Sequence, residues 1–215
     1  MIAIVDYRAG NLTSVARALR YLGHDCVITA AAAELRRAER LIFPGVGAAG
    51  AGMQALTELG LGDAIRAAVA AGKPFLGICL GYQVLFESSA EDQVECLGVL
   101  PGRVVRFPDN LRESPESRPL KIPHMGWNRV RFLRPHPVWA GVPDDSEFYF
   151  VHSYFPVPPP ERVCATADYG LTFAAGCCRD NLVAFQFHPE KSGAPGLRLL
   201  ENFCRWTPTA GSRVC

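Results

Sequence analysis

Short apolar runs alternate with longer amphipathic stretches through the first half of the chain. The apolar runs have the length and continuity of buried strands and cover residues 2–5, 26–29, 40–43 and 74–78. The stretches between and after them are typical of helices and cover residues 11–22, 31–38, 52–59, 63–71 and 80–86. Strands and helices that alternate at this spacing predict a parallel sheet with helices on both faces.

The second half of the chain has a different pattern. It is rich in strand-like segments with few helical stretches between them, at residues 104–107, 128–132, 147–151, 163–167, 171–178 and 182–187. One amphipathic helix is expected at its end, over residues 196–206. We therefore predict an α/β fold with a central, mostly parallel sheet and extra antiparallel strands contributed by the second half.

Composition narrows the class of protein without indicating a function. The 215 residues suit one compact domain, which we expect to span residues 1–215. A formal net charge of +1 gives no support to a nucleic-acid or membrane-surface partner. The eight cysteines lack zinc-site spacing, and the chain shows no secretory signal or membrane-spanning run. We expect a cytoplasmic protein with no metal and no cofactor.

The strongest local chemical signal is Gly77-Ile-Cys-Leu-Gly81, which follows an expected strand and opens an expected helix. A nucleophile on a tight strand-to-helix turn needs small neighbours, and glycine on both sides avoids Cβ clashes. The helix N-terminus beside Cys79 favours a thiolate, and its free N–H groups can bind an oxyanion. The alternative is a buried cysteine before a glycine-rich turn.

A thiol nucleophile usually requires a base, and His188 is the best placed of the five histidines. It follows the expected strand at residues 182–187, and Glu190 lies two residues beyond it, where a carboxylate can orient the imidazole. By contrast, His24 and His136 lie in turn-like or proline-flanked segments, where we expect loop positions. A Cys-His-Glu triad of Cys79, His188 and Glu190 is the resulting hypothesis.

Pro44-Gly-Val-Gly47 also follows an expected strand. Its two glycines permit a backbone that turns an N–H toward a developing oxyanion, with the N–H of Leu80 as a second donor. An ordinary glycine-rich loop would have the same sequence.

Taken together, Gly77-Ile-Cys-Leu-Gly-Tyr-Gln83 and Gln186-Phe-His-Pro-Glu-Lys-Ser192 resemble the two signatures of the class I, triad-type glutamine amidotransferases. Further segments resemble the glutaminase subunits of imidazole glycerol phosphate synthase, a group within that family, and Pro123-His-Met-Gly-Trp-Asn128 is the most specific of them. The resemblance covers nearly the whole chain. It implies one glutaminase domain of flavodoxin-like or α/β-hydrolase-like architecture.

The resemblance also implies a role for each matching residue. Cys79 would attack glutamine, His188 would act as base and then acid, and Glu190 would orient His188, while Val46 and Leu80 form the oxyanion hole. The substrate glutamine would be contacted by Gly47, Gln83, Glu91, Ser153 and Tyr154. A partner would be contacted by Asn11, Met125, Trp127, Asn128 and Lys191. In the same way, His152 would be a wall of the binding site.

The partner implied is the (β/α)₈ cyclase subunit of the synthase. It would receive ammonia and make imidazole glycerol phosphate and aminoimidazole carboxamide ribotide in histidine biosynthesis. The alternative is a paralogous glutaminase that supplies ammonia to another synthase, such as a sugar-modifying amidotransferase. An intact triad disfavours a non-catalytic scaffold, and Gln83 with Glu91 disfavours a cysteine peptidase of the same superfold. The chain departs from the family pattern at Ala49, Tyr82 and Ala184, which affects loop packing but none of the catalytic positions.

Overall fold

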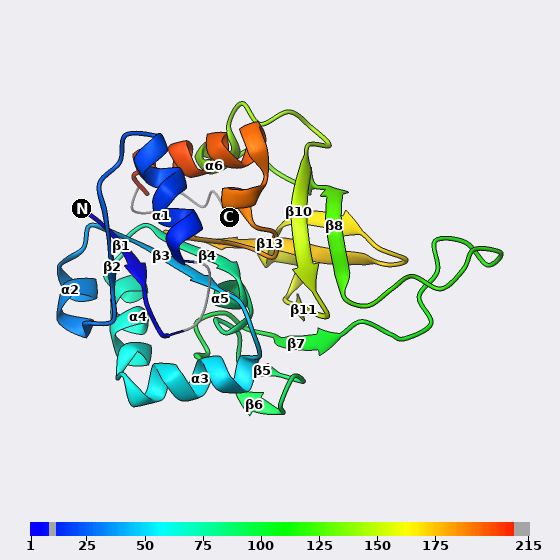
Figure 1. Cartoon of the computed structure of the whole chain (residues 1–215), viewed down its shortest axis with the longest axis horizontal. Helices are drawn as coiled ribbons and strands as arrows, with labels where there is room; N and C mark the ends of the chain where they lie inside the picture. The colour runs from blue at the N-terminus through cyan, green and yellow to red at the C-terminus, as the bar shows by residue number, and fades with distance from the viewer. Residues whose placement is uncertain (9–11, 209–215) are drawn as a thin grey trace.

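The computed structural model describes residues 1–8 and 12–208 and is built on an eight-stranded mixed sheet (Figure 1). The strand order is β2-β1-β3-β4-β14-β13-β12-β9. The first five strands are parallel, and the last three join antiparallel. The strands of this sheet are β1 (Ile2–Val5), β2 (Cys26–Thr29), β3 (Arg40–Gly45), β4 (Phe75–Cys79), β9 (Arg131–Phe132), β12 (Val163–Asp168), β13 (Thr172–Arg179) and β14 (Leu182–Phe185).

Helices cover both faces of the sheet, as the alternating pattern predicted (Figure 1). One face packs against α1 (Leu12–Tyr21) and α6 (Gly193–Arg205), whose apolar sides join one hydrophobic core. The other face packs against α2 (Ala32–Arg37), α3 (Ala49–Glu58) and α4 (Leu61–Ala70) in a second core. The remaining helical elements are short: α5 (Leu80–Gln83), η1 (Pro137–Trp139), η2 (Pro160–Arg162) and η3 (Pro189–Lys191).

Two smaller sheets extend the structure beyond the central one. Strand β8 (His124–Arg129) pairs antiparallel with β10 (Glu147–His152). A four-stranded sheet has the order β11-β7-β5-β6. Its strands are β5 (Ser88–Ser89), β6 (Val94–Glu95), β7 (Arg103–Arg106) and β11 (Tyr154–Val157).

The α/β class and the mostly parallel sheet are confirmed, but two local predictions were wrong. A strand was expected only from residue 128, whereas β8 already begins at His124. The expected helix at residues 80–86 ends at Gln83. After it the chain tightens into turns, because Leu85 N and Phe86 N donate three residues back, to Tyr82 O and Gln83 O, and not four.

His136 lies in a loop between prolines, as expected, and its side chain is buried there. Its Nδ1 accepts a hydrogen bond from Val138 N at 3.1 Å and so caps η1. His24, also expected in a loop, is partly exposed, and its Nε2 lies 2.8 Å from Glu201 Oε2 on α6.

Candidate active site

Three neighbouring parallel strands bring the expected catalytic segments to one edge of the central sheet. Strand β4 lies between β3 and β14, and all three run in the same direction. Gly45 pairs with Cys79 at the end of β3 and β4, and His188 follows β14 by three residues. The carboxyl edge of a parallel sheet is where α/β proteins bind their ligands. The topology therefore joins segments that are more than a hundred residues apart.

The turn at Cys79 has the strained geometry expected of a nucleophile elbow. Cys79 has φ 54° and ψ −111°, a conformation that residues with side chains rarely adopt. A Cβ at position 81 would lie 1.8 Å from Phe43 O, so only glycine lets α5 begin against β3. A Cβ at position 77 would lie 3.0 Å from both the Ala184 Cβ and Gly81 O. Close packing therefore requires glycine at position 81 and leaves little room for a side chain at position 77, as the flanking glycines predicted.

His188 and Glu190 form a buried pair next to the thiol. His188 Nδ1 lies 2.8 Å from Glu190 Oε1, and each side chain is 2% exposed. Because a carboxylate accepts, Nδ1 carries a proton and Glu190 fixes the ring orientation. Nε2 is buried without a hydrogen-bond partner. It is the ring nitrogen left to exchange a proton during a reaction.

The charge of His188 depends on its two neighbours. Burial by itself lowers the pKa of His188, but the electrostatic interaction with Cys79 and the hydrogen bond and charge of Glu190 raise it to about 10. The surroundings therefore favour the imidazolium form of His188. An imidazolium can protonate a poor leaving group such as an amide nitrogen.

A pocket of about 260 Å³ opens at the thiol. It brings together residues expected at the nucleophile, the oxyanion hole and the glutamine site, although they come from five separate segments of the chain. Its walls are formed by Val46, Gly47, Cys79, Leu80, Gln83, Glu91, Pro123, Val151, His152, Ser153 and Tyr154. Both residues expected in the oxyanion hole and all five expected substrate contacts are among them, and His152 is a wall residue as expected.

Two amide side chains connect the pocket wall with the thiol. Gln83 Nε2 donates to Tyr154 O at 2.9 Å and to Gln186 Oε1 at 3.0 Å. Gln186 Nε2 in turn lies 3.7 Å from Cys79 Sγ. Gln186 was not singled out from the sequence. Its position two residues before His188 could have indicated it, since residues at that spacing in an extended segment share a face.

Glu91 lines the pocket and also holds the start of α3. Its Oε2 accepts a hydrogen bond from Ala49 N at 2.9 Å, at the first residue of α3. Burial raises the pKa of Glu91, while the hydrogen bond from Ala49 acts in the opposite direction. The adjacent Asp92 accepts from Gly50 N at 3.0 Å. The acidic pair thus fixes the start of α3 next to the segment that contains Val46.

A chain of neutral histidines connects β8 with the pocket wall. His152 Nδ1 lies 2.8 Å from Tyr154 O and must donate to it, so His152 Nε2 accepts from His124 Nδ1 at 3.0 Å. His124 Nε2 then accepts from Asn128 Nδ2 at 3.2 Å. Burial lowers the pKa of His124 to about 4 and of His152 to about 3, so both are neutral at pH 7.

The residues expected at a partner interface do not all lie on one surface. Met125 and Trp127 are 61% and 56% exposed and alternate with buried His124 on β8. Trp127 contacts Tyr149 edge to face at 6.2 Å between ring centroids, and Lys191 Nζ lies 5.7 Å from the Tyr149 ring. Asn128 lies on the opposite face of β8 and donates to Asp168 O at 2.8 Å. Asn11 falls outside the described residues.

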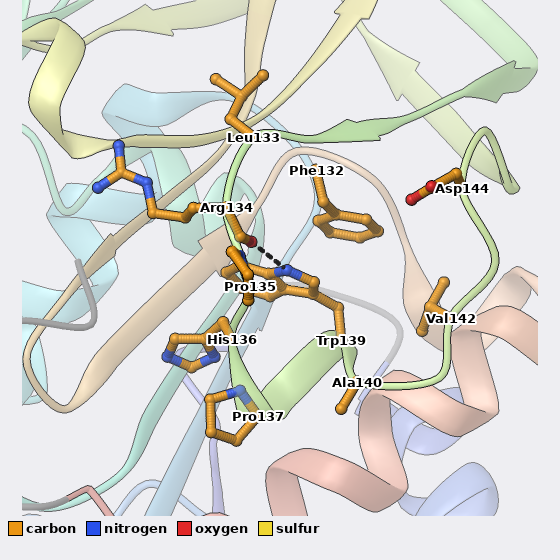
Figure 2. Close-up of a pocket in the computed structure, with 10 residues that line it drawn as sticks. All are labelled: Phe132, Leu133, Arg134, Pro135, His136, Pro137, Trp139, Ala140, Val142 and Asp144. Atoms are coloured by element: carbon orange, nitrogen blue, oxygen red, sulfur yellow. Dashed lines mark hydrogen bonds between the residues drawn. The ribbon is translucent and has the colours of Figure 1, made fainter.

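A larger groove of about 620 Å³ lies elsewhere, around the segment from Phe132 to Asp144 (Figure 2). The Trp139 ring stacks between those of Phe132 and His136, and Trp139 Nε1 donates to Arg134 O at 2.8 Å. None of the expected catalytic or substrate-binding residues lines this groove. The smaller pocket at Cys79 is therefore the candidate active site.

Within the described ranges there is no cluster of three or more His, Cys, Asp or Glu residues that could hold a metal ion. In residues 1–8 and 12–208, no helix has the length and apolar character needed to cross a membrane.

Comparisons with known proteins agree with this geometry. The family model described as "Glutamine amidotransferase class-I" matches residues 3–206. The "Imidazole glycerol phosphate synthase subunit HisH" of Desulfovibrio desulfuricans is 53% identical over 203 residues, covering 94% of this chain and 93% of that protein. The protein of the same name from Methylococcus capsulatus is 51% identical over 212 residues, covering 96% and 97%.

Solved structures resemble the chain in fold. A crystal structure of a glutamine amidotransferase superimposes with a TM-score of 0.69 at 21% identity, covering 95% of this chain and 100% of the other. The structure of PurLQS from Thermotoga maritima gives 0.70 at 16% identity, covering 95% and 97%.

Proposed function

The chain belongs to the class I glutamine amidotransferase family, and from that premise we propose that it is the glutaminase subunit of imidazole glycerol phosphate synthase in histidine biosynthesis. One observation carries the glutaminase activity: the described residues include a buried Cys-His-Glu constellation beside a pocket of about 260 Å³. Relatives at about half identity over nearly their whole length carry the name of that synthase subunit. They favour this synthase over a paralogous one.

The first half of the proposed reaction makes a thioester. The Cys79 thiolate attacks the side-chain carbonyl carbon of glutamine, and the carbonyl oxygen becomes an oxyanion that the N–H groups of Val46 and Leu80 bind. The His188 imidazolium then donates its Nε2 proton to the amide nitrogen. The C–N bond breaks, ammonia leaves, and a γ-glutamyl thioester remains on Cys79.

The second half releases glutamate. Neutral His188 now takes a proton from water, and the resulting hydroxide attacks the thioester carbon. The C–S bond breaks, Cys79 leaves as a thiolate, and His188 is again an imidazolium. Glu190 stays ionised throughout and stabilises the positive charge of His188 across their 2.8 Å contact.

The binding roles follow from the walls of the pocket. Gln83, Glu91, Ser153 and Tyr154 are proposed to recognise the α-amino and α-carboxylate groups of glutamine, and Gly47 to leave room for its side chain. A free Glu91 oxygen can accept from an α-ammonium group while the other holds α3.

Ammonia is proposed to pass to a (β/α)₈ cyclase partner that forms imidazole glycerol phosphate and aminoimidazole carboxamide ribotide. The exposed face of β8 and β10 next to the active site is the surface we assign to this partner. Met125, Trp127 and Lys191 share that face. Met125 and Trp127 have the large apolar side chains that are typical of interface anchors. Asn11 and Asn128 are also proposed to contact the partner. We also propose a cytoplasmic enzyme with one glutaminase domain over residues 1–215.

The experiment that tests this function measures glutamate release from glutamine by the purified chain. It is run alone, with the cyclase subunit, and with the cyclase subunit plus its nucleotide substrate. We expect low activity alone and strong stimulation by partner and nucleotide. High activity that the partner does not change would contradict the coupled-subunit assignment. Stimulation by a different synthase, and not by the cyclase, would support the paralogous alternative.

A further inference from the structure

Tyr7 is a buried polar residue that the proposed mechanism leaves unexplained. Its side chain is fully buried, and its hydroxyl has no hydrogen-bond partner. Burial raises the pKa of Tyr7 above its ordinary value, and the charge of Cys79 acts in the same direction, so the phenol stays protonated. Buried hydroxyl groups nearly always have a partner, and an exception needs a physical explanation.

The hydroxyl lies between the two backbone turns of the proposed oxyanion hole. An ideal Cβ on Gly45 would fall 1.9 Å from Tyr7 Oη, so the phenol occupies the space that a side chain at position 45 would need. The same Cβ position is 3.0 Å from the Leu80 Cβ and 3.1 Å from Gly81 N. The Tyr7 ring packs edge to face on Phe43 at 5.3 Å. Tyr7 does not line the pocket, so any effect that it has on the oxyanion hole must pass through the backbone of these turns.

The peptide group between Gly45 and Val46 links this hydroxyl to the oxyanion. In a trans peptide the N–H and the C=O point in opposite directions. When Val46 N–H faces the oxyanion in the pocket, the carbonyl of Gly45 faces away from the pocket, toward the side where Tyr7 lies. The Tyr7 hydroxyl is therefore a donor without a partner, and the Gly45 carbonyl is an acceptor that could bind it.

We propose that Tyr7 is a positioning residue: its hydroxyl donates a hydrogen bond to the carbonyl of Gly45 in the catalytic state and so holds Val46 N–H toward the oxyanion. This inference rests on the proposed glutaminase function. In the described structure the Tyr7 hydroxyl has no partner, and the proposal assigns the bond to the catalytic state.

The test uses the full chain with its cyclase partner and nucleotide, and compares wild type with Tyr7→Phe. We expect kcat for glutamine hydrolysis to fall about tenfold with KM within about twofold, less than the roughly hundredfold or greater loss of removing an oxyanion donor itself. The thermal midpoint of Tyr7→Phe should be unchanged or higher, because the variant loses an unpartnered buried hydroxyl. Alkylation of Cys79 by iodoacetamide should keep its wild-type rate, since that displacement at carbon forms no oxyanion.

Tyr82→Phe is the matched control. Tyr82 is also fully buried, but its hydroxyl donates to Cys177 Sγ at 3.0 Å. This variant should lower the thermal midpoint and leave kcat within about twofold.

Three results would overturn the Tyr7 proposal: an unchanged kcat, a loss of kcat matched by slower alkylation of Cys79, or a lower thermal midpoint or failure to fold. A wild-type complex that does not hydrolyse glutamine would contradict the proposed function instead, and so the two failures are distinguishable.

Discussion

Gly81→Ala tests the claim that close backbone packing sets the geometry of the nucleophile elbow. The added Cβ would lie 1.8 Å from Phe43 O and 2.7 Å from Phe43 C, and both are backbone atoms that cannot rotate away. To reach ordinary contact, α5 and β3 must separate by more than about 1 Å at this point. We expect a cost of about 1–3 kcal/mol in the free energy of unfolding, as for other overpacked sites.

The same displacement should affect catalysis more than stability. Leu80 N and Cys79 lie within two residues of the change, and a misplacement of about 1 Å can lower a rate roughly a hundredfold. Glutamate release by the partner-bound enzyme should therefore fall about a hundredfold in kcat, in a variant that urea titration shows to be folded. Gly62→Ala on α4 is the matched control, because its Cβ would meet nothing closer than Leu97 Cδ2 at 3.3 Å. It should keep full activity, with stability changed by less than about 1 kcal/mol. Wild-type kcat in Gly81→Ala would refute the packing argument.

Three further predictions use other parts of the structure. Glu190→Gln should lower kcat at least tenfold, because the imidazolium of His188 loses its charged partner. A pH–rate profile should show a lower apparent pKa of the catalytic histidine. An unshifted profile would contradict the pairing of His188 with Glu190. Burial lowers the pKa of His124 and His136 from 6.5 to about 4 and of His152 to about 3. As the pH falls, protons therefore bind these histidines in the unfolded chain before they bind them in the folded chain, and the free energy of unfolding should decrease from pH 6.5 toward pH 4. A free energy of unfolding from urea titration that does not change over this range would contradict the prediction. Trp127→Ala should weaken cyclase binding by at least tenfold in calorimetry and leave the thermal midpoint of the isolated chain unchanged. An unchanged affinity would show that the cyclase binds a different surface.

The sequence allowed the first half of the fold to be predicted because buried parallel strands are continuous apolar runs. The runs at residues 2–5 and 26–29 match β1 and β2 without any shift in their bounds. Strand β8 gave no such signal, since it places Met125 and Trp127 on the exposed face and a glycine between them. Its strand conformation depends on pairing with β10, a contact that no local pattern encodes.

The candidate site was predictable where local geometry restricts residue type. At Gly81 the neighbouring backbone leaves no room for a Cβ, and at Gly77 a Cβ would be a tight contact, which is why glycines flank Cys79. Tyr7 could not be recognised in this way, because its place beside Gly45 depends on strands that only the folded sheet brings together. Gln186 could have been inferred only from its spacing to His188. The helix expected beside the thiol is a single turn, because the next N–H groups, those of Leu85 and Phe86, donate three residues back and not four.

The most direct test of the account is glutamine hydrolysis by Cys79→Ala in complex with the cyclase subunit and nucleotide. Because Cys79 is the proposed nucleophile, glutamate release should fall to the background rate while the cyclase subunit is still bound with wild-type affinity. Cys96→Ala, which removes a free thiol outside the pocket, should keep wild-type activity. Glutamate release by Cys79→Ala at a rate comparable with wild type would contradict the central claim that this thiol attacks glutamine.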